Sequence, residues 1–129
     1  MKPVIFLNDL DLTVLMDNSF RLVNPFYVML NGKEVIIPAD FKTDLASVPR
    51  IPVVYLAVGG RGHKAAVVHD WLYQTGLYPR KECDEFFYFA LRESGVGYFY
   101  AMAMYNGVRM GGAAYYDANQ MAKQWLSYL

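Results

Sequence analysis

A nearly continuous apolar run with a histidine and an aspartate at its centre constrains the fold of this chain most. The run KAAVVHDWLY surrounds His69 and Asp70 with alanine, valine and leucine. Buried histidine and aspartate side chains cost free energy unless they are paired or hydrogen-bonded. Tyr73 lies one helical turn after His69, on the same face. The run predicts a buried helix whose polar pair finds partners in other segments, with Asp84 and Asp44 as the candidates.

The first forty residues carry the signals of β-strands. Residues of β-branched and aromatic type are concentrated in three short segments, 13–16, 20–23 and 26–30. Asn31 and Gly32 form the dipeptide most typical of a tight hairpin, and a further strand is expected over 33–37. These signals predict a small antiparallel sheet.

From residue 63 onward the signals are helical. Gly76 is a natural end for a helix over 63–75, and a second helix is expected over 80–93. A last helical stretch is expected over 96–128, broken near Gly111 and Gly112. The predicted fold class is therefore α+β, with a small N-terminal antiparallel sheet followed by three or four C-terminal helices.

Length and composition favour one domain. With 129 residues the chain has room for a single core, so we expect one domain over 1–129. Within it, 1–40 is the β part, 41–62 a motif-bearing loop region and 63–129 the helical part. Aromatic residues reach 16%, and the eleven tyrosines and seven methionines fit a dense core or surfaces that meet partners.

Charge and cysteine content exclude several classes of protein. The formal net charge is zero, which gives no basic stripe for nucleic acid. Cys83 is the single cysteine, so neither an internal disulfide nor a cysteine-rich zinc site is expected. No signal peptide is expected at the N-terminus. The longest apolar run near the C-terminus, 96–105, is shorter than the roughly 20 residues that a transmembrane segment needs.

Four residues are candidates for a catalytic site. An imidazole can take a proton from water, which would make His69 a general base. A carboxylate is a natural ligand for calcium, which would make Asp70 a metal ligand. Asp84 could accept a hydrogen bond from His69 and fix its tautomer, with Tyr73 nearby. The alternative is a buried His/Asp cluster that only holds the helices together, so the residues leave open whether the chain is an enzyme.

A second motif, FKTDLASVP, precedes the apolar run. Thr43, Asp44 and Ser47 are residue types that cap helices and turns, and Pro49 closes the motif. Asp44 is also a candidate metal ligand. Both interpretations of this segment stay open.

Taken together, the FKTDLASVP and HDWLY motifs resemble a family of small, functionally uncharacterised proteins encoded by tailed bacteriophages and prophages. The resemblance covers about 20–109. It implies a viral origin and, with no signal peptide, a location in the virion or the host cytoplasm. It implies no activity.

The residues His69, Asp70, Tyr73 and Asp84 also resemble the catalytic core of secreted and parvoviral phospholipases A2. Those enzymes carry His-Asp-x-x-Tyr on one helix and an aspartate on a second, antiparallel helix. The resemblance implies that His69 activates water, that Asp70 binds calcium, and that Tyr73 and Asp84 orient the histidine. It implies no other cofactor.

One element of the phospholipase pattern is displaced here. The glycine-rich calcium loop of those enzymes lies further from the histidine than the segment GGRG at 59–62 does. Asp44 is the candidate to replace it. The metal could be calcium, another cation or absent.

Three functions are open at this point. The first is a bacteriophage-encoded, virion-associated protein with a phospholipase-A2-like site, acting as a metal-dependent hydrolase. The second is a non-catalytic structural protein of the virion. The third is an intracellular phage accessory protein that binds a host factor. Tyrosines and methionines after residue 96 favour contact with other virion proteins, or self-association, through the C-terminal helices.

Overall fold

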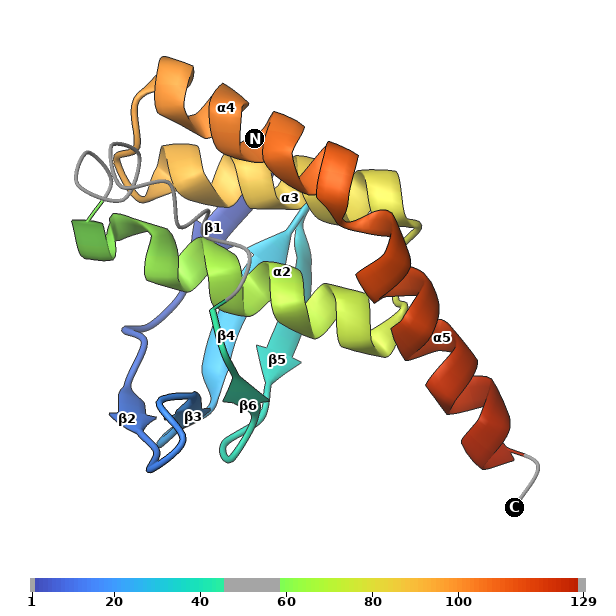
Figure 1. Ribbon diagram of the computed structural model, residues 1–129. Coiled ribbons are helices and arrows are strands. Elements are labelled where there is room, and N and C mark those ends of the chain that lie inside the picture. Colours follow the sequence, from blue (N-terminus) through green and yellow to red (C-terminus); the bar gives the residue numbers. More distant parts are fainter. Residues whose placement is uncertain (1, 46–58, 128–129) are drawn as a thin grey trace.

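The structure, a computed structural model, describes residues 2–45 and 59–127. Two small antiparallel sheets lie in the first part and four α-helices in the second (Figure 1). The strands are β1 (Val4–Phe6), β2 (Leu12–Val14), β3 (Phe20–Leu22), β4 (Phe26–Leu30), β5 (Lys33–Ile37) and β6 (Lys42–Thr43). The helices are the short 3-10 helix η1 (Gly59–Gly62), α2 (His63–Thr75), α3 (Arg80–Glu93), α4 (Tyr98–Gly111) and α5 (Ala113–Ser127). The predicted α+β fold class is confirmed.

The sheets have the strand orders β1-β4-β5 and β2-β3-β6. Asn31 and Gly32 both have positive φ, 49° and 80°, as a tight hairpin requires, and they join Leu30 to Lys33 in register. The predicted hairpin is therefore confirmed. Strand β1 was not predicted, and β6 falls in the segment expected to be a loop. Asp40, with a φ of 71°, turns the chain after β5, so β6 pairs with β3 in the second sheet.

Helices α2 and α3 run antiparallel, side by side, across the sheet of β1, β4 and β5 (Figure 1). Their predicted ranges agree with the structure. Helix α2 ends at Gly76, whose φ of 66° is left-handed and whose N–H donates to the Leu72 carbonyl at 3.0 Å. One buried apolar cluster joins strand β4, through Phe26 and Val28, to helix α3, through Phe87. This packing fixes the faces that α2 and α3 turn toward each other.

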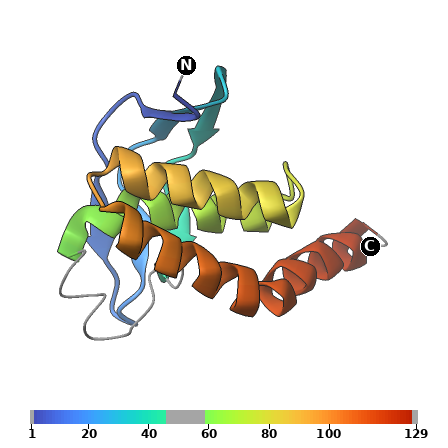
Figure 2. The same ribbon diagram turned by 90° about the horizontal axis from the view of Figure 1, so that it is seen from above.

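Helix α4 packs along α3, whereas α5 leaves the body of the protein at an angle (Figures 1 and 2). The predicted break near Gly111 and Gly112 is confirmed, since α4 ends at the first and α5 starts after the second. No residue of α5 is buried. Among the helices that the structure describes, none is long and apolar enough to cross a membrane.

Candidate functional site

The carboxylate of Asp84 is the centre of the candidate site. Its Oδ1 atom lies 2.6 Å from His69 Nε2 and accepts a hydrogen bond of 2.6 Å from the Tyr73 hydroxyl. Asp84 is fully buried and His69 is 3% exposed. The structure thus brings together the three residues that the sequence analysis predicted as catalytic.

Helix geometry explains why these side chains meet. His69 and Tyr73 are four residues apart on α2, so they project from one face. Asp84 lies in the second turn of α3, which packs antiparallel against that face. The imidazole ring also contacts the rings of Tyr73, at a centroid distance of 4.1 Å, and Phe87, at 4.8 Å. These contacts leave the imidazole little freedom to turn.

Two arginines bind the other oxygen of Asp84. Arg109, near the end of α4, donates from Nη1 to Oδ2 at 2.8 Å. Arg80, one turn before Asp84 on α3, lies 3.4 Å from the same oxygen. Each of these four side chains can donate a hydrogen bond to the carboxylate, which is the arrangement that an ionised aspartate needs.

The pKa directions agree with this picture. Burial by itself raises the pKa of the Asp84 carboxyl, but hydrogen bonds from His69, Tyr73 and Arg109 outweigh burial and hold that pKa below its usual value. Burial, followed by the hydrogen bond to Asp84, raises the pKa of Tyr73 well above its usual value. The hydrogen bond to Asp84 raises the pKa of Arg109. Asp84 is thus an anion held by donors that keep their protons.

Asp70, the predicted metal ligand of α2, has a separate set of partners. It is 4% exposed, and its Oδ1 accepts hydrogen bonds from Tyr115 of α5 at 2.6 Å and from Gln74 at 3.2 Å. Burial, followed by the hydrogen bond to Asp70, raises the pKa of Tyr115 to about 12. Although it neighbours His69 in the chain, Asp70 therefore belongs to the contact between α2 and α5.

The residues of the FKTDLASVP motif are only partly within the described structure. Thr43 is buried at the end of β6, and its Oγ1 accepts a hydrogen bond of 3.1 Å from the Leu45 N–H. A hydrogen bond from the N–H two residues later is typical of a threonine that stabilises a turn. Asp44 is exposed in the same turn. Ser47 and Pro49 lie outside the described residues.

The metal-binding role of Asp70 and Asp44 stays a prediction. Within 2–45 and 59–127, no three His, Cys, Asp or Glu side chains come close enough together to hold a metal ion. The described side chains alone do not make up a cation site.

Sequence reasoning missed four residues that bind the site carboxylates, namely Gln74, Arg80, Arg109 and Tyr115. Arg80 carried a usable signal, because a basic residue four positions before Asp84 lies on the same face of α3. Arg109 is 25 residues away from Asp84, and Tyr115 is 45 residues away from Asp70. Only the packing of α4 and α5 brings these two to the site.

Comparison with known proteins assigns the chain to a family. Residues 20–108 match the family described as "Protein of unknown function (DUF1353)", and the match covers more than half of the chain. The chain belongs to the DUF1353 family. Comparison with curated proteins gives no match, and comparison with solved structures gives none either.

The DUF1353 region contains most of the candidate site. It includes His69, Tyr73, Arg80 and Asp84, and it ends one residue before Arg109. The predicted membership of a family of unknown function is confirmed. The viral origin and the phospholipase A2 resemblance stay predictions.

Proposed function

We propose that this protein is a bacteriophage-encoded, virion-associated hydrolase that cleaves carboxylic esters of phospholipids with a water molecule activated by His69. One observation supports the proposal most. The buried Asp84 Oδ1 accepts hydrogen bonds from both His69 Nε2 and Tyr73 Oη, at 2.6 Å each. This is the arrangement that the phospholipase A2 resemblance implies for a histidine that acts as a general base.

The proposed reaction follows from the tautomer that Asp84 selects. An ionised Asp84 accepts the Nε2–H, so Nδ1 carries the lone pair of the neutral imidazole. His69 Nδ1 takes a proton from water as the water oxygen bonds to the ester carbonyl carbon. When the C–O bond to the alcohol breaks, the imidazolium returns that proton to the leaving oxygen. The products are a carboxylic acid and an alcohol, and the Asp84 carboxylate stabilises the imidazolium in between.

Tyr73 and Asp70 have different parts in this proposal. Tyr73 keeps its proton and donates to Asp84, so it orients the carboxylate rather than the substrate. Asp70 is the residue that a divalent cation would contact if the reaction needs one. Its Tyr115 partner would have to share or yield the Oδ1 atom.

The proposal is tested by fatty acid release from vesicles of mixed zwitterionic and anionic phospholipids, with added calcium and with a chelator. We expect His69→Asn to lower the rate by about 10²–10⁴-fold, the usual contribution of a general base. Asp40→Asn, which alters an exposed ion pair with Arg21, is the matched control. If the wild-type protein releases no more fatty acid than H69N under either condition, the hydrolase proposal is wrong.

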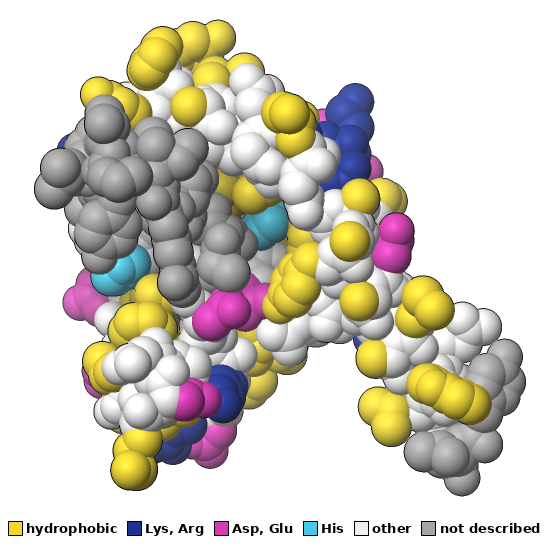
Figure 3. Space-filling model, viewed as in Figure 1, with side chains coloured by type: hydrophobic (Ala, Val, Ile, Leu, Met, Phe, Trp, Pro, Cys, Tyr) yellow, Lys and Arg dark blue, Asp and Glu magenta, His cyan; other side chains and the backbone are white. Residues whose placement is uncertain are grey.

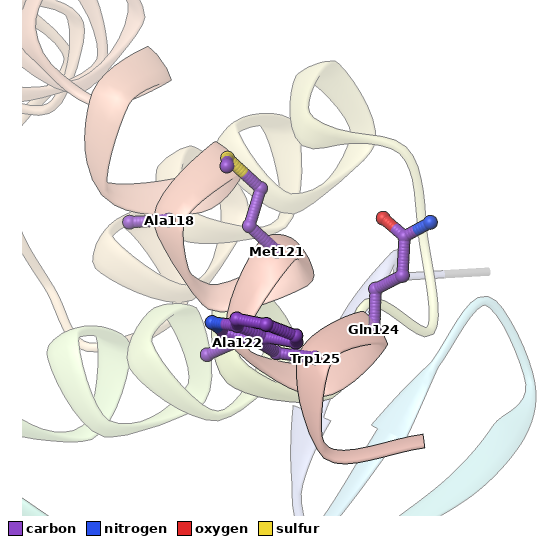
Figure 4. Close-up of a pocket in the computed structure, with 5 residues that line it drawn as sticks. All are labelled: Ala118, Met121, Ala122, Gln124 and Trp125. Atoms are coloured by element: carbon purple, nitrogen blue, oxygen red, sulfur yellow. The ribbon is translucent and has the colours of Figure 1, made fainter. Parts of the chain in front are cut away.

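A second candidate function has its own observation. Large apolar side chains are exposed on α4 and α5, where they are visible as scattered yellow surface in Figure 3. On α4 these are Tyr98, Phe99 and Met110, and on α5 they include Tyr115, Met121, Trp125 and Leu126. A shallow apolar pocket of about 580 Å³ lies on α5, between Met121 and Trp125 (Figure 4). Such surfaces favour a structural component of the virion, with the His/Asp cluster only holding the helices together.

Mass spectrometry of purified phage particles separates the remaining possibilities. Presence in particles together with no ester hydrolysis would support the structural function. Absence from particles, with a monodisperse monomer in solution, would contradict both virion proposals and favour an accessory protein that binds a host factor.

A further inference from the structure

We propose that Arg109 is a positioning residue for the proposed hydrolysis, and that it acts by fixing the orientation of the Asp84 carboxylate. This inference rests on the function proposed for His69. It adds a residue from α4 that neither the family match nor the catalytic motif includes.

The division of donors between the two carboxylate oxygens supports the proposal. Oδ1 is used by α2, through His69 and Tyr73, and Oδ2 is used by arginines. A carboxylate that is bound only at Oδ1 can turn about its Cβ–Cγ bond, so that neither oxygen stays in line with the Nε2–H of His69. The 2.8 Å bond from Arg109 to Oδ2 fixes this rotation, so Oδ1 stays directed at the imidazole.

Arg80 has a different part from Arg109. Its Nη1 lies 3.4 Å from Asp84 Oδ2, 3.4 Å from the Val108 carbonyl and 3.2 Å from the Arg109 carbonyl. One nitrogen with two hydrogens cannot satisfy three acceptors fully, and the Arg109 carbonyl is the closest. Arg80 therefore holds the last turn of α4, where the Val108 carbonyl also accepts the Gly112 N–H at 2.8 Å, and so keeps Arg109 in reach of Asp84.

Because the Asp84 carboxylate is buried, its orientation depends on the side chains that bind it and not on water. Asp84 is fully buried, whereas the side chains of Arg109 and Arg80 are 30% and 21% exposed. The arginines bring charge to the carboxylate from the surface while it stays out of water. A neutral replacement of Arg109 would leave Oδ2 with Arg80 at 3.4 Å, which is too long for a strong bond.

The test measures the tautomer of His69 directly, from the ¹⁵N chemical shifts of its ring nitrogens in Arg109→Gln. In the wild-type protein we expect a single neutral tautomer with the proton on Nε2. In R109Q we expect a mixture, and kcat for ester hydrolysis reduced by about 10- to 100-fold with KM unchanged. Arg109→Lys keeps a positive charge but lacks the planar guanidinium. We therefore expect its tautomer ratio and its kcat to lie between those of the wild-type protein and those of R109Q. His63, the other histidine, is an internal reference whose signals should not change.

The control is Arg21→Gln, which removes an exposed arginine–aspartate pair and should leave the His69 tautomer unchanged. A folded R109Q with the wild-type tautomer would overturn the inference and leave Arg109 a merely structural role. If R109Q does not fold, Arg80→Gln decides the matter: a mixed tautomer supports the inference, and the wild-type tautomer overturns it. Absence of hydrolysis in the wild-type protein would contradict the proposed function, whereas the tautomer measurement would still test Arg109.

Discussion

Asp84 is fully buried and Asp70 nearly so, and both lie near His69, but their carboxylates have different sets of hydrogen-bond donors. Asp84 takes hydrogen bonds from three helices, α2, α3 and α4, at both of its oxygens. Asp70 takes two at one oxygen, from Gln74 of its own helix and from Tyr115 of α5. Helix α3 buries six residues, whereas α5 buries none.

This difference indicates that one acid is part of the body of the protein and the other depends on a peripheral helix. Asp84 cannot lose one partner without leaving others buried and unpaired, so its geometry is fixed by many contacts. Asp70 depends on a helix that is attached through side-chain hydrogen bonds such as those of Gln120 with the Tyr73 carbonyl and Tyr116 with the Tyr78 carbonyl. Four predictions test how far the contrast extends.

The largest effect is expected for Asp84→Ala. The substitution leaves two arginines, a histidine and a tyrosine without their common acceptor, and breaking a buried ion pair costs about 3–5 kcal/mol. Urea denaturation followed by circular dichroism measures the free energy of unfolding. Arg21→Ala, which breaks the exposed pair with Asp40, should cost less than about 1 kcal/mol. An equal loss of unfolding free energy in the two variants would show that the buried ion pairs of Asp84 contribute no more than an exposed pair.

For Asp70→Ala we expect a smaller loss, about 1–3 kcal/mol, because fewer partners are left unpaired. The same denaturation experiment applies. A loss as large as that of Asp84→Ala would show that α5 is as firmly attached as α3. An unchanged midpoint would instead show that Asp70 is well solvated, and would leave it only a role in ligand binding.

Adjacent glycines at the junction of α4 and α5 provide a matched pair of substitutions. A Cβ at Gly112 would overlap the Tyr73 hydroxyl oxygen, whereas a Cβ at Gly111 would meet nothing within 4 Å. We therefore expect Gly112→Ala to destabilise the protein by about 1–3 kcal/mol through overpacking. Gly111→Ala should be neutral or stabilise α4 by up to about 1 kcal/mol. Thermal unfolding of both variants checks the difference in sign, and similar midpoints would contradict the close approach of the junction to Tyr73.

The smallest effect is expected for Tyr115→Phe, and it depends on pH. The folded-state pKa of Tyr115 is about 12, and an unfolded tyrosine has a pKa of about 10. Between these values the folded state binds more protons, so the stability that Tyr115 contributes is complete below about pH 10 and is lost as the pH rises through about 12. Denaturation midpoints from pH 7 to 12 should show a flatter alkaline decline in Y115F. An unaltered decline, matching that of the surface control Tyr98→Phe, would show that the bond to Asp70 is broken in solution.

Local sequence signals were sufficient for most of the fold. The ranges of β4, α2 and α3 were predictable because turn and cap residues such as Asn31, Gly32 and Gly76 mark their ends. Strand β6 has two residues, which is too short for a periodic pattern, and the short apolar run that contains β1 is broken by Asn8 and Asp9. Both exist only because a neighbouring strand is there to pair with, and this is a tertiary property.

The same distinction between local signals and tertiary packing holds for the residues of the candidate site. His69, Tyr73 and Asp84 were predictable, since four-residue spacing sets one helical face and a short connection makes α3 the neighbour of α2. Arg109 and Tyr115 were not, because nothing in their own segments indicates which carboxylate they will reach. A buried aspartate in the sequence predicts that hydrogen-bond donors surround it. Which residues these donors are depends on how the helices pack.

The two tryptophans of the chain lie in the two regions compared above, Trp71 on α2 in the body of the protein and Trp125 on the peripheral helix α5. Trp71 is half-buried on α2 next to Asp70 with its ring edge-on to Phe41, and its indole N–H has no hydrogen-bond partner among the described residues. Trp125 is 73% exposed on α5. An indole in an apolar environment emits at shorter wavelength than one in water, so the emission spectrum contains a separate signal from each region. A protein with Trp125 replaced by phenylalanine would report on the candidate site alone, and one with Trp71 replaced would report on what the peripheral helix meets.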